Sequence, residues 1–222
     1  MGAAARILCV AAMFCLCVLA YTAGRWGLAD LNAVEPRSAI RQWAAGKAMP
    51  VPGDVEAVRI ALERVLRLEP DDPGVKEELG FVHGWAAAQA FAGGDGAQHA
   101  AAALRYLHTA VRERPVSSYA WAALAAAKWR MRITDAQFEH ALREASRLGP
   151  WEPQVQLALV DTGLQAWPVL PATTRQVVQD TVGRSLLRQD AAVFAIARKH
   201  GRLDVVCGAR GVARSRFAYA CI

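Results

Sequence analysis

The sequence lacks the short motifs that mark most metal-binding, nucleotide-binding and hydrolytic sites. It contains no HExxH pair, no GxSxG elbow and no CxxC pair that could hold zinc. Its five histidines are scattered at spacings that form no helical ligand pair: His83, His99, His108, His140 and His200. We interpret them as surface or packing residues. We therefore expect no metal, no cofactor and no catalytic residue.

The chain is also poor in the residues that favour strands, and its charge is not concentrated. Aromatic residues make up 8% of the sequence, whereas alanine and leucine dominate an apolar share of 54%. This composition favours helices, excludes wholesale disorder and argues against an all-β sandwich. The net charge is +6, but arginines alternate with acidic residues and form no dense basic block. We expect no nucleic-acid partner.

One uncharged segment lies near the start of the chain. Residues 7–24 read ILCVAAMFCLCVLAYTAG and are flanked by Arg6 and Arg25. At about 1.5 Å per helical residue, this length is the lower limit for crossing a bilayer core of about 30 Å. The segment is either a signal peptide or a membrane helix. Because the residues before position 24 form a poor cleavage site, we expect an uncleaved, single-pass anchor.

Two sets of residues give opposite indications of the side on which the body lies. Arg25, Arg37 and Arg41 follow the apolar segment and outnumber the positive charges before it, which favours a cytoplasmic body. The signal-like layout and the pair Cys207 and Cys221, a possible disulfide, favour the periplasm. We expect the periplasmic side. In the alternative interpretation, the two cysteines are unrelated small apolar residues.

An internal repeat organises the body. Three stretches have similar sequences, ALERVLRLEP, YLHTAVRERP and ALREASRLGP, at residues 61–70, 106–115 and 141–150. Each ends in a proline, and the ninth residue after each proline is a leucine: Leu79, Leu124 and Leu159. Proline ends a helix, and an apolar helix follows each one, so the unit is a helical hairpin. The sequence predicts an all-α stack of such hairpins.

The repeat resembles the tetratricopeptide repeat (TPR). Leu79 and Gly80 match the Leu-Gly pair of that family, Trp121 stands at its early aromatic position, and Ala110 and Ala145 match a small position before the final proline. The first proline interval is longer than the 34 residues of the family. We place the surplus in a glycine-rich loop at residues 92–100, which lacks the Lys-Ser or Lys-Thr of a phosphate loop.

These observations predict four segments. They are a signal-anchor or transmembrane helix at residues 1–24, a short helix and linker at 25–55, TPR-like repeats at 56–168, and a C-terminal capping helix and tail at 169–222. In the last segment, Thr173 or Thr174 can cap the helix and Gly201 can end it.

The TPR resemblance implies a concave groove that is lined by the first helix of each hairpin. Transferring the groove positions of the family onto this sequence selects six candidate partner-binding residues: Glu77, Trp85, Trp129, Arg130, Asp161 and Gln165. Tryptophan and arginine dominate interface energies. The alternative is that Trp85 and Trp129 fill the core. Trp121, Trp151 and Trp167 are expected to cover turns.

The body also resembles the VpsP-like family of bacterial exopolysaccharide biosynthesis proteins, over nearly the whole chain. The most specific matches are Arg114-Pro115, Ala120-Trp121 and the run Leu148-Gly149-Pro150-Trp151-Glu152-Pro153. Similar phrases occur in the TPR tails of O-antigen ligase-like membrane proteins. The resemblance implies a small protein with one membrane helix that supports polysaccharide production, and it supplies no catalytic residue.

Together these patterns predict an accessory, inner-membrane-anchored repeat protein of exopolysaccharide biosynthesis or export, which acts by protein–protein interaction as a scaffold. One alternative is an assembly factor of another envelope system, such as cytochrome maturation or pilus biogenesis. The other alternative is a glycan-active enzyme.

Overall fold

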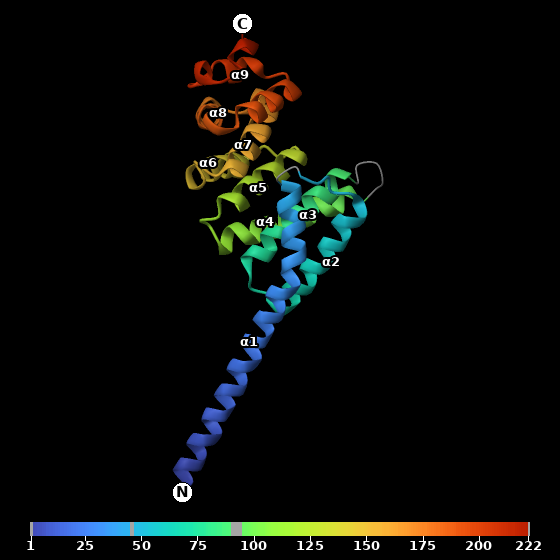
Figure 1. The fold of residues 1–222 in the computed structure, drawn as a ribbon, viewed down its shortest axis with the longest axis vertical. Helices are drawn as coiled ribbons and strands as arrows, with labels where there is room; N and C mark the ends of the chain where they lie inside the picture. Colours follow the sequence, from blue (N-terminus) through green and yellow to red (C-terminus); the bar gives the residue numbers. More distant parts are fainter. Residues whose placement is uncertain (1, 45–46, 90–94, 222) are drawn as a thin grey trace.

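The computed structural model describes residues 2–44, 47–89 and 95–221, and every regular element within these ranges is a helix. The first helix projects from a body of stacked helices (Figure 1). The main helices are α1 (Ala3–Ala44), α2 (Pro52–Leu68), α3 (Pro73–Gln89), α4 (Gly96–Glu113), α5 (Ser118–Arg130), α6 (Ala136–Leu148), α7 (Pro153–Ala166) and α8 (Ala172–His200). The chain ends in α9 (Leu203–Cys207) and short 3₁₀ turns, including η4 (Ala218–Cys221).

The helices pair in sequence order into hairpins. The pairs are α1 with α2, α3 with α4, α5 with α6, and α7 with α8, and the first helices of successive hairpins contact one another. Leu79, Leu124 and Leu159, which the proline register predicts to be equivalent, are all buried in the core. The structure therefore confirms the all-α, TPR-like hairpin stack with one long apolar N-terminal helix.

Local sequence explains where several helices begin and end. Ser117 Oγ accepts a hydrogen bond from the Ala120 amide at 3.2 Å, and Asp135 caps α6 through the Phe138 amide at 2.8 Å. Gly201 ends α8 in a left-handed conformation with φ 62°, as predicted. The predicted threonine cap is wrong, because the structure has Pro171 at the N-cap and Thr174 buried inside the first turns.

Glycines permit the closest approach within two of the hairpins. A Cβ atom on Gly80 of α3 would lie 2.5 Å from Leu107 Cγ on α4. A Cβ atom on Gly163 of α7 would lie 2.6 Å from Val178 Cγ2 on α8. Contacts this short would force the helices apart, so both hairpins depend on glycine at these positions.

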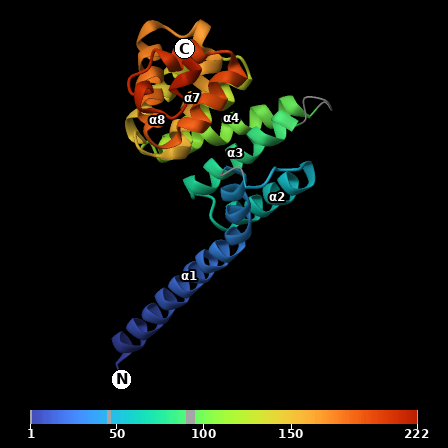
Figure 2. The same ribbon diagram turned by 45° about the horizontal axis from the view of Figure 1, so that its top comes forward.

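Helix α1 differs from the short helix and linker that we expect over residues 25–55. It continues without interruption to Ala44, with Pro36 inside it. The outer part is long and apolar enough to cross a membrane, and its most apolar window, with mean hydropathy 2.3, has none of its residues buried in the body (Figures 1 and 2). The inner part buries Ala29, Ala33 and Trp43 against α2 and α3. The long apolar N-terminal helix is thus also the first helix of the first hairpin.

Part of the predicted glycine-rich loop lies outside the described residues. Of the stretch 92–100, residues 92–94 are outside, and α4 already begins at Gly96. The division of the chain into the four segments given above stays a prediction.

The buried apolar residues form two cores. The N-terminal core joins α1, α2 and α3, and its large members include Leu62, Val65 and Leu79. The C-terminal core joins α4 to α9, and its fully buried members include Leu124, Phe138, Leu142, Leu164 and Phe194. The tail closes on the C-terminal core, where Cys207 and Cys221 are joined with their Cα atoms 5.5 Å apart.

Candidate partner-binding groove

The first helices of all four hairpins line one hollow on the body. Its volume is about 390 Å³, and its wall is built by α1, α3, α5 and α7. Three alanines of α5 form the floor: Ala122, Ala123 and Ala126. Small side chains at these positions leave the space between the neighbouring helices unfilled. We refer to this hollow as the groove.

Aromatic rings from α1 and α3 form one wall of the groove. The Trp43 and Trp85 rings meet edge to face with centroids 5.1 Å apart, and Phe81 meets Trp85 in the same way at 4.4 Å. Phe81 keeps 37% of its surface exposed. Such rings combine a large apolar surface with few rotatable bonds, and interfaces are enriched in them. This wall offers contact area for an apolar side chain.

Arg130 is the positively charged group of the groove. It is the last residue of α5, where the helix dipole favours a positive charge. Gly84 on α3 leaves room for it, since a Cβ atom there would lie 3.2 Å from Arg130 Nη1. Among the residues that the structure describes, Arg130 forms no ion pair and no side-chain hydrogen bond. The surrounding walls disfavour its charge and lower the pKa of Arg130, an effect that the charge of Asp161 opposes.

Two of the acidic groups of the groove are engaged on α3. Glu77 Oε2 accepts a hydrogen bond from Ser117 Oγ at 2.8 Å, and Glu78 Oε1 accepts one from Arg37 Nε at 2.8 Å. Burial raises the pKa of Glu77 and of Glu78, whereas these partners lower it. Glu78 Oε2 is buried without a partner. These carboxylates serve contacts within the chain.

Asp161 on α7 is held by three side chains. It accepts hydrogen bonds from His200 Nε2 at 2.8 Å, from Lys199 Nζ at 3.3 Å and from Gln165 Nε2 at 3.0 Å. Among the described lining residues, Arg130 is the positively charged group, and its guanidinium has no hydrogen-bond partner. The groove therefore offers one unpaired positive charge, beside three carboxylates, to whatever it binds.

The structure brings together four of the six candidate residues. Glu77, Trp85, Arg130 and Asp161 line the groove. Trp129 and Gln165 lie beside it, where Trp129 Nε1 donates a hydrogen bond to Gln165 Oε1 at 3.1 Å. The Trp129 ring stacks near Phe138 of the C-terminal core, with centroids 6.2 Å apart. Partner binding by these residues stays a prediction.

Sequence reasoning misses the contribution of α1. Ile40 and Trp43 line the groove, and so do Phe81 and Tyr119 on the neighbouring helices. The spacing of Ala29, Ala33, Ile40 and Trp43 on one helical face is the signal that could have revealed it.

The three tryptophans that we expect to cover turns have different environments in the structure. Trp121 is buried and its Nε1 donates to the Pro115 carbonyl at 2.8 Å, so it covers a turn as expected. Trp167 packs near Arg175, whose guanidinium carbon lies 5.5 Å from the ring centroid. Trp151 keeps 57% of its surface exposed, because it stands in the turn before α7 and packs on no core.

Two of the five histidines lie against each other, and the other three have different neighbours. His83 Nδ1 and His99 Nδ1 are 3.0 Å apart, and the His140 ring meets Trp121 edge to face with centroids 5.1 Å apart. Gln137 hydrogen bonds to His108 at 3.1 Å. Over residues 2–44, 47–89 and 95–221, no group of three or more His, Cys, Asp or Glu residues is arranged to hold a metal ion.

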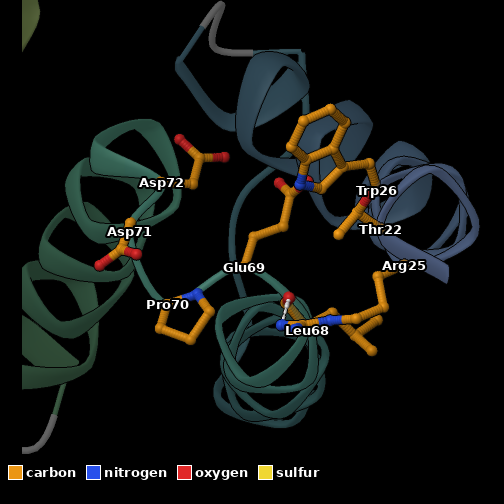
Figure 3. Close-up of a pocket in the computed structure, with 8 residues that line it drawn as sticks. All are labelled: Thr22, Arg25, Trp26, Leu68, Glu69, Pro70, Asp71 and Asp72. Carbon is orange, nitrogen blue, oxygen red and sulfur yellow. Dashed lines mark hydrogen bonds between the residues drawn. The ribbon is translucent and has the colours of Figure 1, made fainter. Parts of the chain in front are cut away.

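A second cavity, of about 360 Å³, lies where α1 leaves the body (Figure 3). Thr22, Arg25 and Trp26 of α1 face the turn between α2 and α3 across it. Arg25 donates a hydrogen bond to the Leu68 carbonyl. Burial raises the pKa of Glu69 in that turn, with the charge of Asp72 as a further cause. This contact holds the outer part of α1 against the turn between α2 and α3.

The stacked hairpins with their groove define a TPR-like helical repeat protein. No family model matches the chain, and no curated protein matches it. Among solved structures, the chain is similar to a thermophilic TPR protein of Thermus thermophilus, with 19% identity over 82% of this chain and 88% of that chain and a TM-score of 0.48.

Proposed function

We propose that this protein is a membrane-anchored scaffold whose groove binds a segment of a partner protein. The observation that carries the proposal is the groove itself, which runs across the first helices of four consecutive hairpins. The aromatic wall would take apolar side chains, and Arg130 would pair with a carboxylate of the segment. The groove supplies contacts rather than chemistry, and the proposal assigns no catalytic residue.

The anchor and the tail support a location for this scaffold. We place α1 in the bacterial inner membrane as an uncleaved anchor, with the body in the periplasm. The Cα atoms of Cys207 and Cys221 lie at a distance that suits a disulfide, and disulfides persist in oxidising compartments. The positive-inside count of the arginines after residue 24 favours the opposite side, so the thiol state of the two cysteines decides between them.

We propose further that the partner belongs to an exopolysaccharide synthesis or export complex. This part is supported only by the VpsP-like resemblance. In the structure, the matching residues form turns: Pro115 accepts the Trp121 hydrogen bond, and Pro150 accepts one from Gln156 Nε2 at 2.7 Å. These residues thus have structural roles in this chain and do not identify the pathway. Experiment must decide whether the partner belongs to the polysaccharide machinery.

Complementation tests both parts of the proposal. Deleting the gene should lower the secreted polysaccharide, and the wild-type gene should restore it. Arg130→Glu should fail to restore it, because the reversed charge repels the carboxylate of the partner. The matched control is Arg112→Glu, on the exposed face of α4 away from the groove.

The outcomes separate the pathway from the site. Normal polymer yield in the deletion strain contradicts the polysaccharide role and favours another envelope system. Full restoration by Arg130→Glu contradicts the groove as the binding site. Arg130 forms no hydrogen bond or ion pair among the described residues, but the charge of Asp161 acts on it. Its variant should therefore lower the melting temperature only slightly, and a melting curve checks this.

A further inference from the structure

Helix α1 has a second apolar face that the body leaves uncovered. The body packs on the side that carries Ala29, Ala33 and Trp43. At 3.6 residues per turn, Leu31 points about half a turn away from that side. Leu28, Leu31 and Val34 keep 51%, 73% and 61% of their surfaces exposed. A partner could approach this face without displacing the body.

The uncovered face continues along α1 toward the N-terminus as a regular line. Its members recur at alternating spacings of three and four residues: Cys17, Ala20, Gly24, Gly27, Leu31 and Val34. This alternation is the pattern by which two parallel helices pack along a shared seam. We refer to these six residues as the seam.

The two glycines have no packing reason within the chain. A Cβ atom at Gly24 or Gly27 would meet nothing within 4 Å. Glycine inside a helix costs about 1 kcal/mol relative to alanine, so it is disfavoured where nothing approaches the backbone. Small residues on membrane helices allow two helices to approach closely. Gly24 and Gly27 therefore lie where a second helix could approach α1 closely.

Lipid can cover only part of the seam. The uncharged segment ends at Gly24, and Val34 lies ten residues further along, which is about 15 Å at the helical rise. Acyl chains that surround residues 7–24 do not reach that far beyond the bilayer core. The exposed leucine and valine beyond the membrane therefore need a protein surface.

We infer that α1 forms a parallel homodimer along the seam. Two copies inserted in the same membrane have the same orientation. Because their membrane segments are identical, identical residues lie at the same depth in the bilayer. A second copy thus supplies the matching seam, with small residues opposite small residues and Leu31 opposite Leu31. Asp30, whose carboxylate lies 3.7 Å from Arg37 of the same chain, and Glu35 flank the seam and place like charges near each other, which slightly opposes the dimer. The inference rests on the proposed membrane placement of α1 and is independent of the groove and of the pathway.

Cysteine cross-linking in isolated membranes tests the homodimer. In a full chain with Cys9, Cys15 and Cys17 replaced by serine, Leu31→Cys should form a covalent dimer on mild oxidation. The matched control is Asn32→Cys, which is also exposed but is turned about 100° from the seam. The account predicts several-fold more dimer from position 31 than from position 32. Equal yields at the two positions, or cross-links only to a protein of different mass, would overturn it.

A second variant tests the role of the glycines. Gly27→Leu, added to Leu31→Cys, should reduce the covalent dimer several-fold, because the larger side chain separates the helices. Since Gly27 has open space around it in the chain, the melting temperature of the body should stay unchanged. An undiminished dimer with Gly27→Leu would contradict packing along the seam. Asp30→Lys should increase the dimer, because it places a lysine near Glu35 of the second copy.

Discussion

The two cores of the molecule are held together in different ways. The C-terminal core is large and apolar, and the joined cysteines close its tail. The N-terminal core is smaller, and polar contacts tie α1 to it: Arg37 reaches Glu78, and Arg25 reaches the Leu68 carbonyl. The half that carries the long apolar helix is thus the half with less apolar burial. Because the groove takes residues from both halves, a bound segment would couple them.

The largest expected effect comes from a matched pair of core truncations. Leu62 in the N-terminal core and Leu124 in the C-terminal core are both fully buried. Changing either to alanine should cost about 2–5 kcal/mol of unfolding free energy. Leu62→Ala should weaken hydrogen-exchange protection mainly in α1, α2 and α3, and Leu124→Ala mainly in α4 to α8. Equal loss of protection throughout the body in both variants would show that the two cores unfold as one unit.

The disulfide should matter only to the C-terminal half. With a sequence separation of 14 residues, the cross-link should contribute about 3 kcal/mol by the loop-entropy relation. Replacing both Cys207 and Cys221 with serine should loosen α9 and the last turns and leave exchange in α2 unchanged. Alkylation with and without reductant measures the bond directly. Two freely alkylated thiols in isolated membranes would contradict the bond.

The polar contact that holds α1 against the N-terminal core is tested at Arg37. Arg37→Gln removes the partner of a half-buried carboxylate, and Glu78 already has one buried oxygen without a hydrogen bond. We expect a loss of about 1–3 kcal/mol, confined to the docking of α1. Arg41→Gln is the matched control, since Arg41 is exposed on the same helix and forms no ion pair with a described residue. Denaturant midpoints of the two variants provide the comparison, and equal midpoints would show that the tie contributes little.

The smallest effect is a pH dependence that belongs to the N-terminal half. Burial, with the charge of His99 as the next cause, lowers the pKa of His83 from 6.5 to about 4. Since the folded pKa lies below the unfolded value, the unfolded chain takes up the proton first. The stability from a neutral His83 is present above about pH 6.5 and is lost as the pH falls toward 4. Besides burial, four charged groups shift the pKa of His83: His99, Arg59, Arg105 and Glu56.

His83→Gln tests the pH dependence because it removes the titrating ring. Between pH 7 and pH 4.5, the wild-type denaturant midpoint should fall more than that of the variant. Identical slopes for the two proteins would assign the pH dependence to other groups. Lowering the pH should change the stability of the C-terminal core equally in the wild type and in the variant.

The sequence predicts the two halves with unequal success, for a physical reason. From α3 to α8, proline marks the turn before each new hairpin, so the leucine register identifies buried residues correctly. In α1, the apolar composition of the outer part obscures the helical face that continues into the body, and Pro36 suggests a break where the helix in fact continues. Four of the groove residues on α3, α5 and α7 follow from repeat register: Glu77, Trp85, Arg130 and Asp161. Trp43 does not, because its place depends on how one hairpin stacks on the next.

The most direct test of the central claim is photo-cross-linking from the floor of the groove in living cells. A photoreactive amino acid at Ala126, which lines the groove, should capture one discrete protein. The same group at Arg112, on the exposed face of α4, should not capture it. Loss of the cross-link in Arg130→Glu, together with a captured protein from the polysaccharide machinery, is the predicted result. An identical pattern from positions 126 and 112, or a cross-link that is unaffected by Arg130→Glu, would contradict a binding groove.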